Sequence, residues 1–189
     1  MRLFIAAPIS EEARSGARSV LEALRRSRAD FKWVEPENLH LTLAFFGDVS
    51  AQALPALAKA MDQAAAGRRA FELAFGELGA FDSFERPRVL WIGVSRGAES
   101  LTDLAGALRA ALDRAGLLPE QEKNRAFAAH LTLGRMRSPR RIAELKALLA
   151  DSPPRAEFRS LVDRLALYES RLTSQGPVYR EAAVVRLLR

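Results

Sequence analysis

Hydrophobic residues are clustered at the start of the chain and then change their spacing. The run RLFIAAPI (residues 2–9) is almost entirely apolar over the length of one strand, and Pro8 and Ser10 close it, which predicts a β-strand. After it, apolar residues recur every three or four positions, which predicts an amphipathic helix. Ser10 followed by two glutamates is typical of a helix start. The predicted apolar face consists of Ala13, Ala17, Val20, Leu21 and Leu24.

The same patterns continue to the other end of the chain. Alternating or clustered apolar residues predict strands, and three-to-four spacing predicts helices. Ser138 and Pro139 look like the cap and first position of one of these helices. The predicted elements are an extended segment 31–49 interrupted by Pro36, helix 51–67, strands 70–81 and 88–94, helix 98–116, strand 126–136, helix 138–151, and strands 158–170 and 178–188, bent at Gly176 and Pro177.

The order of these elements repeats within the chain. Strand, helix, strand with the sequence HLTL, and helix describe residues 3–66 and again residues 88–150. We therefore expect an internal duplication with pseudo-twofold symmetry inside one domain, residues 1–189. Helices that accompany mainly antiparallel strands indicate an α+β fold.

The amino-acid composition limits the partners, the chemistry and the cellular location that we expect. The chain has a net charge of +6, which favours a polyanionic partner such as RNA, although an arginine-rich composition alone would also produce it. It has no cysteine, which excludes disulfides and thiolate catalysis. No apolar run reaches the roughly 18 residues of a membrane span, and the N-terminus does not look like a signal peptide, so we expect no membrane association and a cytoplasmic location.

The tetrapeptide HLTL occurs twice and contains the only two histidines, His40 and His130. Side chains alternate between the faces of a strand, so each histidine shares a face with the threonine two residues later, Thr42 or Thr132. The leucines between them are expected to enter the core. The pseudo-twofold axis would then bring the two His-Thr pairs face to face across a cleft.

Several chemistries use histidine, and a single histidine in an apolar strand is usually structural. A zinc site normally has three protein ligands, and no carboxylate stands at ligand spacing beside either histidine. No glycine-framed serine motif is present. Phosphate chemistry fits better, because one imidazole can activate the nucleophile while the other protonates the leaving oxygen, and threonine hydroxyls can donate to phosphate oxygens.

Besides the paired HLTL motifs, four longer segments are informative: RLFIAAPIS, WVEPENLHLTLAFFGDV, AFAAHLTLGRMRSP and LALYESRLTSQGPVYREAAVVRLL. Together they resemble the 2H phosphoesterase superfamily, and within it the RNA 2′,3′-cyclic phosphodiesterases, also called 2′-5′ RNA ligases. The resemblance implies two pseudo-symmetric lobes around a V-shaped cleft, with no metal and no cofactor. It implies hydrolysis of a terminal RNA 2′,3′-cyclic phosphate to a 2′-phosphomonoester by a monomer. His40 would be the proton donor and His130 the proton acceptor, labels that pseudo-symmetry leaves interchangeable, and Thr42 and Thr132 would hold the phosphate.

Two further residues are candidates for substrate binding. Arg135 follows the second motif, where the family commonly has arginine, but strand parity places it on the leucine face unless Gly134 permits a bulge. Phe46 shares parity with His40 and could stack on a terminal base, or else belong to the core. Ala129 stands where the family often has proline. The alternatives left open are 2′-5′ RNA ligation and a non-catalytic RNA-phosphate-binding module, with tRNA fragments among the candidate partners.

Overall fold

The computed structural model of the chain describes residues 1–124, 126–174 and 176–189. The strands are β1 (Arg2–Pro8), β2 (Phe31–Trp33), β3 (His40–Asp48), β4 (Phe71–Asp82), β5 (Pro87–Arg96), β6 (His130–Met136), β7 (Arg159–Val162), β8 (Arg164–Thr173) and β9 (Gly176–Arg186). The helices are α1 (Glu11–Arg25), α2 (Leu54–Ala65), α3 (Ala98–Arg114), α4 (Glu120–Lys123) and α5 (Ile142–Asp151), with 3₁₀ turns η1 (Pro36–Asn38) and η2 (Ala51–Ala53).

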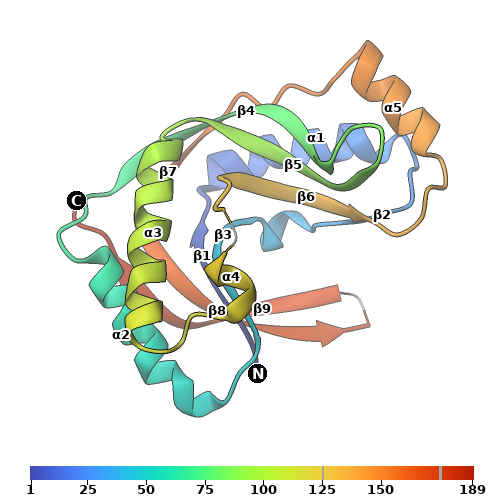
Figure 1. The fold of residues 1–189 in the computed structure, drawn as a ribbon. Helices are drawn as coiled ribbons and strands as arrows, with labels where there is room; N and C mark the ends of the chain where they lie inside the picture. Colours follow the sequence, from blue (N-terminus) through green and yellow to red (C-terminus); the bar gives the residue numbers. More distant parts are fainter. Residues whose placement is uncertain (125, 175) are drawn as a thin grey trace.

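The strands form two antiparallel sheets, as Figure 1 shows. One sheet has the order β3-β1-β8-β9 and the other the order β2-β6-β5-β4-β7. In each sheet the HLTL strand pairs with the strand that opens its predicted repeat, β3 with β1 and β6 with β5. The predicted α+β class is confirmed, although β3 is the edge strand of its sheet whereas β6 lies between β2 and β5.

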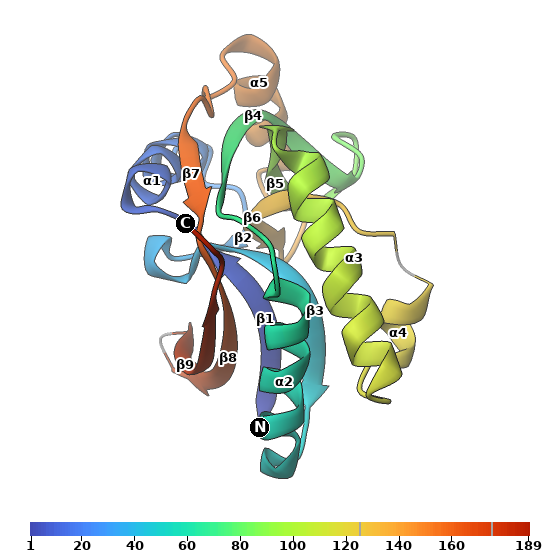
Figure 2. The ribbon, with the colours of Figure 1, turned by 90° about the vertical axis from the view of Figure 1, so that its left-hand side faces the viewer.

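Helices cover the sheets on the side that forms the core. Helices α2 and α3 lie side by side (Figures 1 and 2), and α3 contacts β3 of one sheet and β5 of the other. Apolar side chains from both sheets and these helices form a single cluster that includes Ile5, Leu41, Ile92, Leu104 and Leu131. In the described ranges, no helix has both the length and the apolar character needed to span a membrane.

Helix α1 follows its sequence signals closely. The Ser10 hydroxyl accepts a hydrogen bond from the Ala13 amide at 3.2 Å, so the predicted cap is confirmed. The predicted apolar face is also buried, and it comprises Ala13, Ala17, Val20, Leu21 and Leu24. A helix with these signals starts where the chain can satisfy its first free amides.

Helix α5 does not follow its signals. The prediction that Ser138 caps it is wrong, because the helix begins at Ile142 and is preceded by Arg141 in the left-handed conformation, with φ of 58°. The Ser138 hydroxyl instead donates to the Asp30 carboxylate at 2.6 Å. The side chain that the local sequence pattern predicts as the helix cap therefore forms a tertiary hydrogen bond instead.

The predicted strand 158–170 is in fact two strands. Its first part, β7, pairs with β4, whereas its second part, β8, pairs with β1 in the other sheet. The break lies at Asp163, between the two strands. An apolar run therefore predicted extended structure correctly but could not show that the chain changes sheets within it.

Candidate active site

Each HLTL motif opens a strand, with its histidine as the first strand residue. The motif leucines are buried in the core, and the motif threonines lie between them on the opposite face, where they keep part of their surface exposed. The leucines are Leu41, Leu43, Leu131 and Leu133, and the threonines are Thr42 and Thr132. The predicted alternation is confirmed over both motifs. We call the side of the two sheets that carries His40 and His130 the histidine face.

Each motif ends in a bulge. In β3, Ala6 of the neighbouring strand pairs with Thr42 and Ile5 pairs with Ala44, so Leu43 is an extra residue. In β6 the same irregularity leaves Leu133 extra, because Trp91 pairs with Thr132 and Leu90 with Gly134. Two consecutive residues are therefore buried in both strands, and the parity of the residues that follow is inverted, in β3 as far as a second irregularity between Phe45 and Gly47.

The bulges decide which later residues reach the histidine face. Arg135 now shares the face of His130, as expected if Gly134 permits a bulge. The parity argument for Phe46 is wrong, because the bulge turns Phe46 to the other side, where it is partly buried against the hydrophobic core. Phe45 takes the place expected for Phe46 and is 36% exposed. No sequence signal distinguished these two adjacent phenylalanines.

Both imidazole rings are oriented by the same local hydrogen bond. The His40 Nδ1 atom lies 2.7 Å from the Asn38 carbonyl oxygen, and the His130 Nδ1 atom lies 2.8 Å from the Ala128 carbonyl oxygen. A carbonyl can only accept, so Nδ1 carries a hydrogen in each ring. Nε2 is therefore the basic nitrogen of a neutral ring and the acidic N–H of a charged ring.

His40 is packed among aromatic rings. Phe4 stacks on it with a centroid distance of 4.7 Å, and Tyr179 meets it edge-on at 5.4 Å. Burial lowers the pKa of His40 from 6.5 to about 4; the hydrogen bond to Asn38 acts in the opposite direction, and the charge of His130 lowers the pKa further. His40 is thus neutral near pH 7 in the free protein.

His130 has its own aromatic neighbours on the second sheet. Phe81 meets the ring edge-on at 5.1 Å, and Trp91 does so at 6.1 Å. Because its charge contributes to the pKa of His40, the two rings are close enough to interact electrostatically. The structure therefore brings the two sequence-predicted histidines to one place.

The sequence reasoning missed the aromatic residues of β8 and β9. Tyr179 contacts both His40 and Phe4, and Tyr168 stacks on Phe4 at a centroid distance of 5.2 Å. The Tyr168 hydroxyl donates to the Glu181 carboxylate at 3.3 Å, and burial with this carboxylate raises the pKa of Tyr168 to about 12. Tyr168 and Tyr179 lie far from the motifs in sequence, and only the pairing of β8 with β1 and of β9 with β8 brings them to His40.

Asn38 connects His40 to the other end of its sheet. Its backbone carbonyl accepts from the His40 ring, while its side-chain amide donates to the Pro177 carbonyl at 2.9 Å. Pro177 belongs to β9, the strand that also carries Tyr179. Asn38 therefore holds the orienting carbonyl and the aromatic neighbour in one hydrogen-bonded unit.

We expect Asn38→Ala and Asn38→Asp each to lower kcat up to about tenfold, because a hydrogen bond of this kind contributes about 1 kcal/mol and positions the His40 ring. Neither variant keeps the amide donor, while both keep the backbone carbonyl. Steady-state kinetics on a cyclic-phosphate substrate measures the effect, with thermal unfolding as the control for global damage. A wild-type kcat in both variants would contradict the positioning role.

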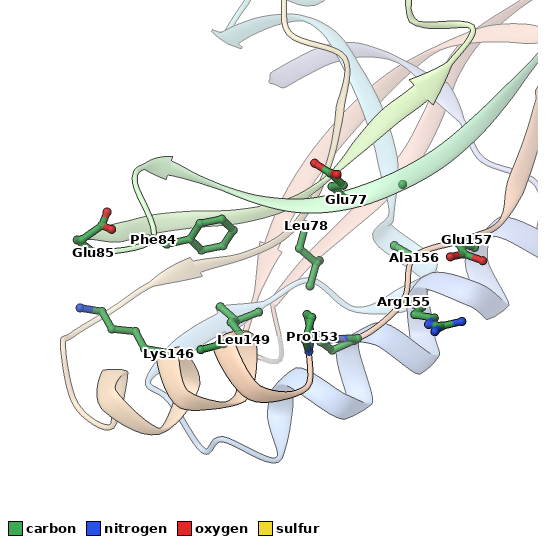
Figure 3. Close-up of a pocket in the computed structure, with 13 residues that line it drawn as sticks. Glu77, Leu78, Phe84, Glu85, Lys146, Leu149, Pro153, Arg155, Ala156 and Glu157 are labelled. Carbon is green, nitrogen blue, oxygen red and sulfur yellow. The ribbon is translucent and has the colours of Figure 1, made fainter.

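A separate cavity of about 700 Å³ lies between α5 and the β4–β5 hairpin. Leu78 of β4 points across it towards Pro153, with Leu149 of α5 beside them and Phe84, Glu85 and Lys146 towards one end (Figure 3). Leu78 pairs with buried Ile92, which puts it on the core side of the sheet, away from the histidine face. This cavity contains neither histidine and is not where the phosphate chemistry would occur.

Within residues 1–124, 126–174 and 176–189, no group of three or more His, Cys, Asp or Glu side chains is arranged to hold a metal ion. The polar side chains closest to the two imidazoles in the motifs are the threonine hydroxyls, which suit phosphate oxygens as hydrogen-bond donors.

Known proteins match this chain in sequence along its length. The sequence model of a family described as LigT like Phosphoesterase matches it twice, over residues 7–91 and 92–179. An RNA 2′,3′-cyclic phosphodiesterase of Aquifex aeolicus is 40% identical over 149 residues, covering 78% of this chain and 77% of the relative. A protein of the same name from Methanothermobacter thermautotrophicus is 32% identical over 187 residues, 99% of each chain.

A solved structure agrees with these matches. The crystal structure of Escherichia coli LigT complexed with 3′-AMP superposes with a TM-score of 0.75 at 28% identity, covering 100% of this chain and 98% of that one. The similarity in three dimensions thus includes both sheets and not only the motif strands.

Proposed function

Because the chain belongs to the family of LigT-like phosphoesterases, we propose that it hydrolyses the 2′,3′-cyclic phosphate at an RNA end to a 2′-phosphomonoester. The observation that carries the proposal is the pair of imidazoles, each held through Nδ1 by a carbonyl and interacting with the other. Such a pair supplies one acid and one base through Nε2, and the reaction needs both.

In the proposed mechanism, His130 Nε2 takes a proton from water as the water oxygen bonds to phosphorus. The bond from phosphorus to the 3′ oxygen breaks, and His40 Nε2 donates its proton to that oxygen, leaving the phosphate on the 2′ oxygen. Thr42, Thr132 and Arg135 hold the non-bridging oxygens as negative charge develops on them. No step requires a metal ion.

The donor role of His40 depends on the bound substrate. In the free protein, burial favours its neutral form. A phosphate anion beside the ring favours the charged form and raises the pKa again. An anion bound against His40 therefore favours its protonated form at the stage when a donor is needed.

The pH dependence of kcat/KM should be bell-shaped, because the active form holds one proton on the pair. Below about pH 4 the free enzyme gains a second proton on His40, no neutral base remains, and activity falls. At high pH the last proton leaves and no acid remains. A profile measured with a cyclic-phosphate dinucleotide in constant ionic strength tests this, and an acidic limb near pH 6.5 would contradict the lowered pKa of His40.

The direct test uses purified protein in EDTA with an RNA oligonucleotide that ends in a 2′,3′-cyclic phosphate. We expect conversion to the 2′-phosphate, and the double variant His40→Ala/His130→Ala is the control for contaminating nuclease. An unchanged cyclic end with tight binding would instead indicate an RNA-binding module. A joined product after addition of a 5′-hydroxyl oligonucleotide would indicate 2′-5′ ligation.

We also propose that the enzyme acts as a monomer in the cytoplasm, on RNA fragments that include those of tRNA. One chain supplies both histidines, which supports a monomer, and the excess of positive charge supports an RNA partner. The two matches of the family sequence model support duplicated units near residues 3–66 and 88–150. Light scattering after size-exclusion chromatography tests the monomer.

A further inference from the structure

Two arginines on the histidine face, Arg2 and Arg135, lack the carboxylate partners that some other arginines in the described parts of the chain have. Arg96 pairs with Glu72 at 2.9 Å and Arg25 with Glu35 at 3.2 Å. Across the described parts of the chain, neither Arg2 nor Arg135 forms an ion pair or a side-chain hydrogen bond. Guanidinium groups without a carboxylate keep all their N–H donors available for a bound anion.

Arg2 lies on the histidine face of β1. Phe4 and Ala6, which share its parity, are buried but stand outside the hydrophobic core cluster, so this side of β1 faces away from the core. The guanidinium carbon of Arg2 lies 5.9 Å from the centroid of the Phe45 ring. A cation over an aromatic ring is held in place without its N–H groups being used.

Arg2 also stands beside Tyr179. Burial raises the pKa of Tyr179, and the positive charges of Arg135 and Arg2 act against this rise, which places both cations near the phenol. Tyr179 is in turn packed edge-on against His40. Tyr179 therefore lies between His40 and Arg2, and Arg2 lies over the Phe45 ring.

The backbone of Arg2 lies at the other end of the β1–β3 pairing from His40, because Arg2 pairs with Asp48. His40 pairs with Pro8, six residues from Arg2 on the same strand, which is about 20 Å between backbone positions. The reacting phosphate already has Thr42, Thr132 and Arg135 in the proposed mechanism. A second anion further along the sheet would suit Arg2, and an RNA strand carries one at every nucleotide.

We propose that Arg2, held over Phe45, binds a phosphodiester upstream of the terminal nucleotide, so that the protein prefers oligonucleotides ending in a cyclic phosphate to cyclic mononucleotides. The inference rests on the proposed function and adds a substrate class to it. Phosphate contacts position a strand without reading its sequence, so the preference is for length and not for particular bases.

The test compares kcat/KM for a trinucleotide ending in a 2′,3′-cyclic phosphate with kcat/KM for the 2′,3′-cyclic mononucleotide. We expect Arg2→Gln to lower the ratio of the two about tenfold, mainly through KM of the trinucleotide, as loss of one charged hydrogen bond predicts. The slope of log(kcat/KM) against log salt should also fall by about 0.7, the value for one phosphate contact on a single strand. Arg2→Lys should retain the salt slope.

Arg114→Gln is the matched control, since it removes the same charge from an exposed position on α3 and should leave the ratio unchanged. If the wild type is active and Arg2→Gln shows the same ratio of kcat/KM values as the wild type, the inference is overturned while the proposed function stands. An equal fall of this ratio in Arg114→Gln would have the same consequence. Wild-type protein inactive on both substrates would overturn the proposed function, and the inference with it.

Discussion

Replacing either motif histidine by alanine, His40→Ala or His130→Ala, should lower kcat by roughly 10²–10⁴-fold, the usual effect of losing a general acid or base. The two rings are oriented in the same way, through Nδ1, and interact electrostatically, so neither can take over both proton transfers. Single-turnover cleavage of a cyclic-phosphate trinucleotide measures the chemical step directly. The double variant should be little slower than the worse single variant, because the pair acts as a unit.

The control for these variants is the fold. His40 packs on Phe4 and Tyr179, so circular dichroism and thermal unfolding must show that each variant is folded at the assay temperature. His40→Gln and His130→Gln keep more of the ring volume and should be equally slow. Wild-type turnover in a folded variant of either histidine would contradict the acid–base assignment and leave phosphate binding as the role of that residue.

The second large expected effect is on the free energy of unfolding. It should differ between a residue on the core face of β6 and a residue on the histidine face. Leu131 is fully buried in the core, so Leu131→Ala should lower the free energy of unfolding by about 2–5 kcal/mol through lost apolar burial and a residual cavity. Its neighbour Thr132 lies on the histidine face and is partly exposed. Thr132→Val should therefore leave the free energy of unfolding within about 1 kcal/mol of the wild type while it lowers kcat.

Urea unfolding measures both variants, and steady-state kinetics is run on the same samples below the unfolding transition. Leu131→Ala should keep most of its kcat there, because the lost side chain does not face the substrate. If Thr132→Val lost stability and kept full activity, the assignment of Thr132 to the phosphate would be wrong. If Leu131→Ala unfolded no more easily than the wild type, the packing of β6 would be wrong.

The elements whose pattern is local were predictable from the sequence. The Ser10 cap and the apolar face of α1 use interactions within a few residues of one another, and the structure contains both. The same holds for the alternation of His40, Leu41 and Thr42, because strand geometry alone imposes it. Such features need no knowledge of what the chain folds against.

The errors arise where a distant partner changes a local rule. Phe46 and Phe45 exchange faces because one extra residue, Leu43, is accommodated opposite β1. In the second motif the extra residue Leu133 likewise places Arg135 on the same face as His130. Ser138 does not cap α5 because its hydroxyl donates a hydrogen bond to Asp30, more than a hundred positions away. In each case a pairing between separate segments outweighs the propensity of the segment itself.

The sequence by itself determined the candidate reacting groups: two histidines, each on a strand with its threonine on one side and its leucines on the other. Tertiary structure alone decided what those groups can do. It brings the two rings together from separate sheets, surrounds His40 with Phe4 and Tyr179, and so lowers its pKa to about 4. The physical reason is that alternation along a strand is set by the backbone of that strand, whereas burial and charge–charge interaction depend on residues that only folding brings near.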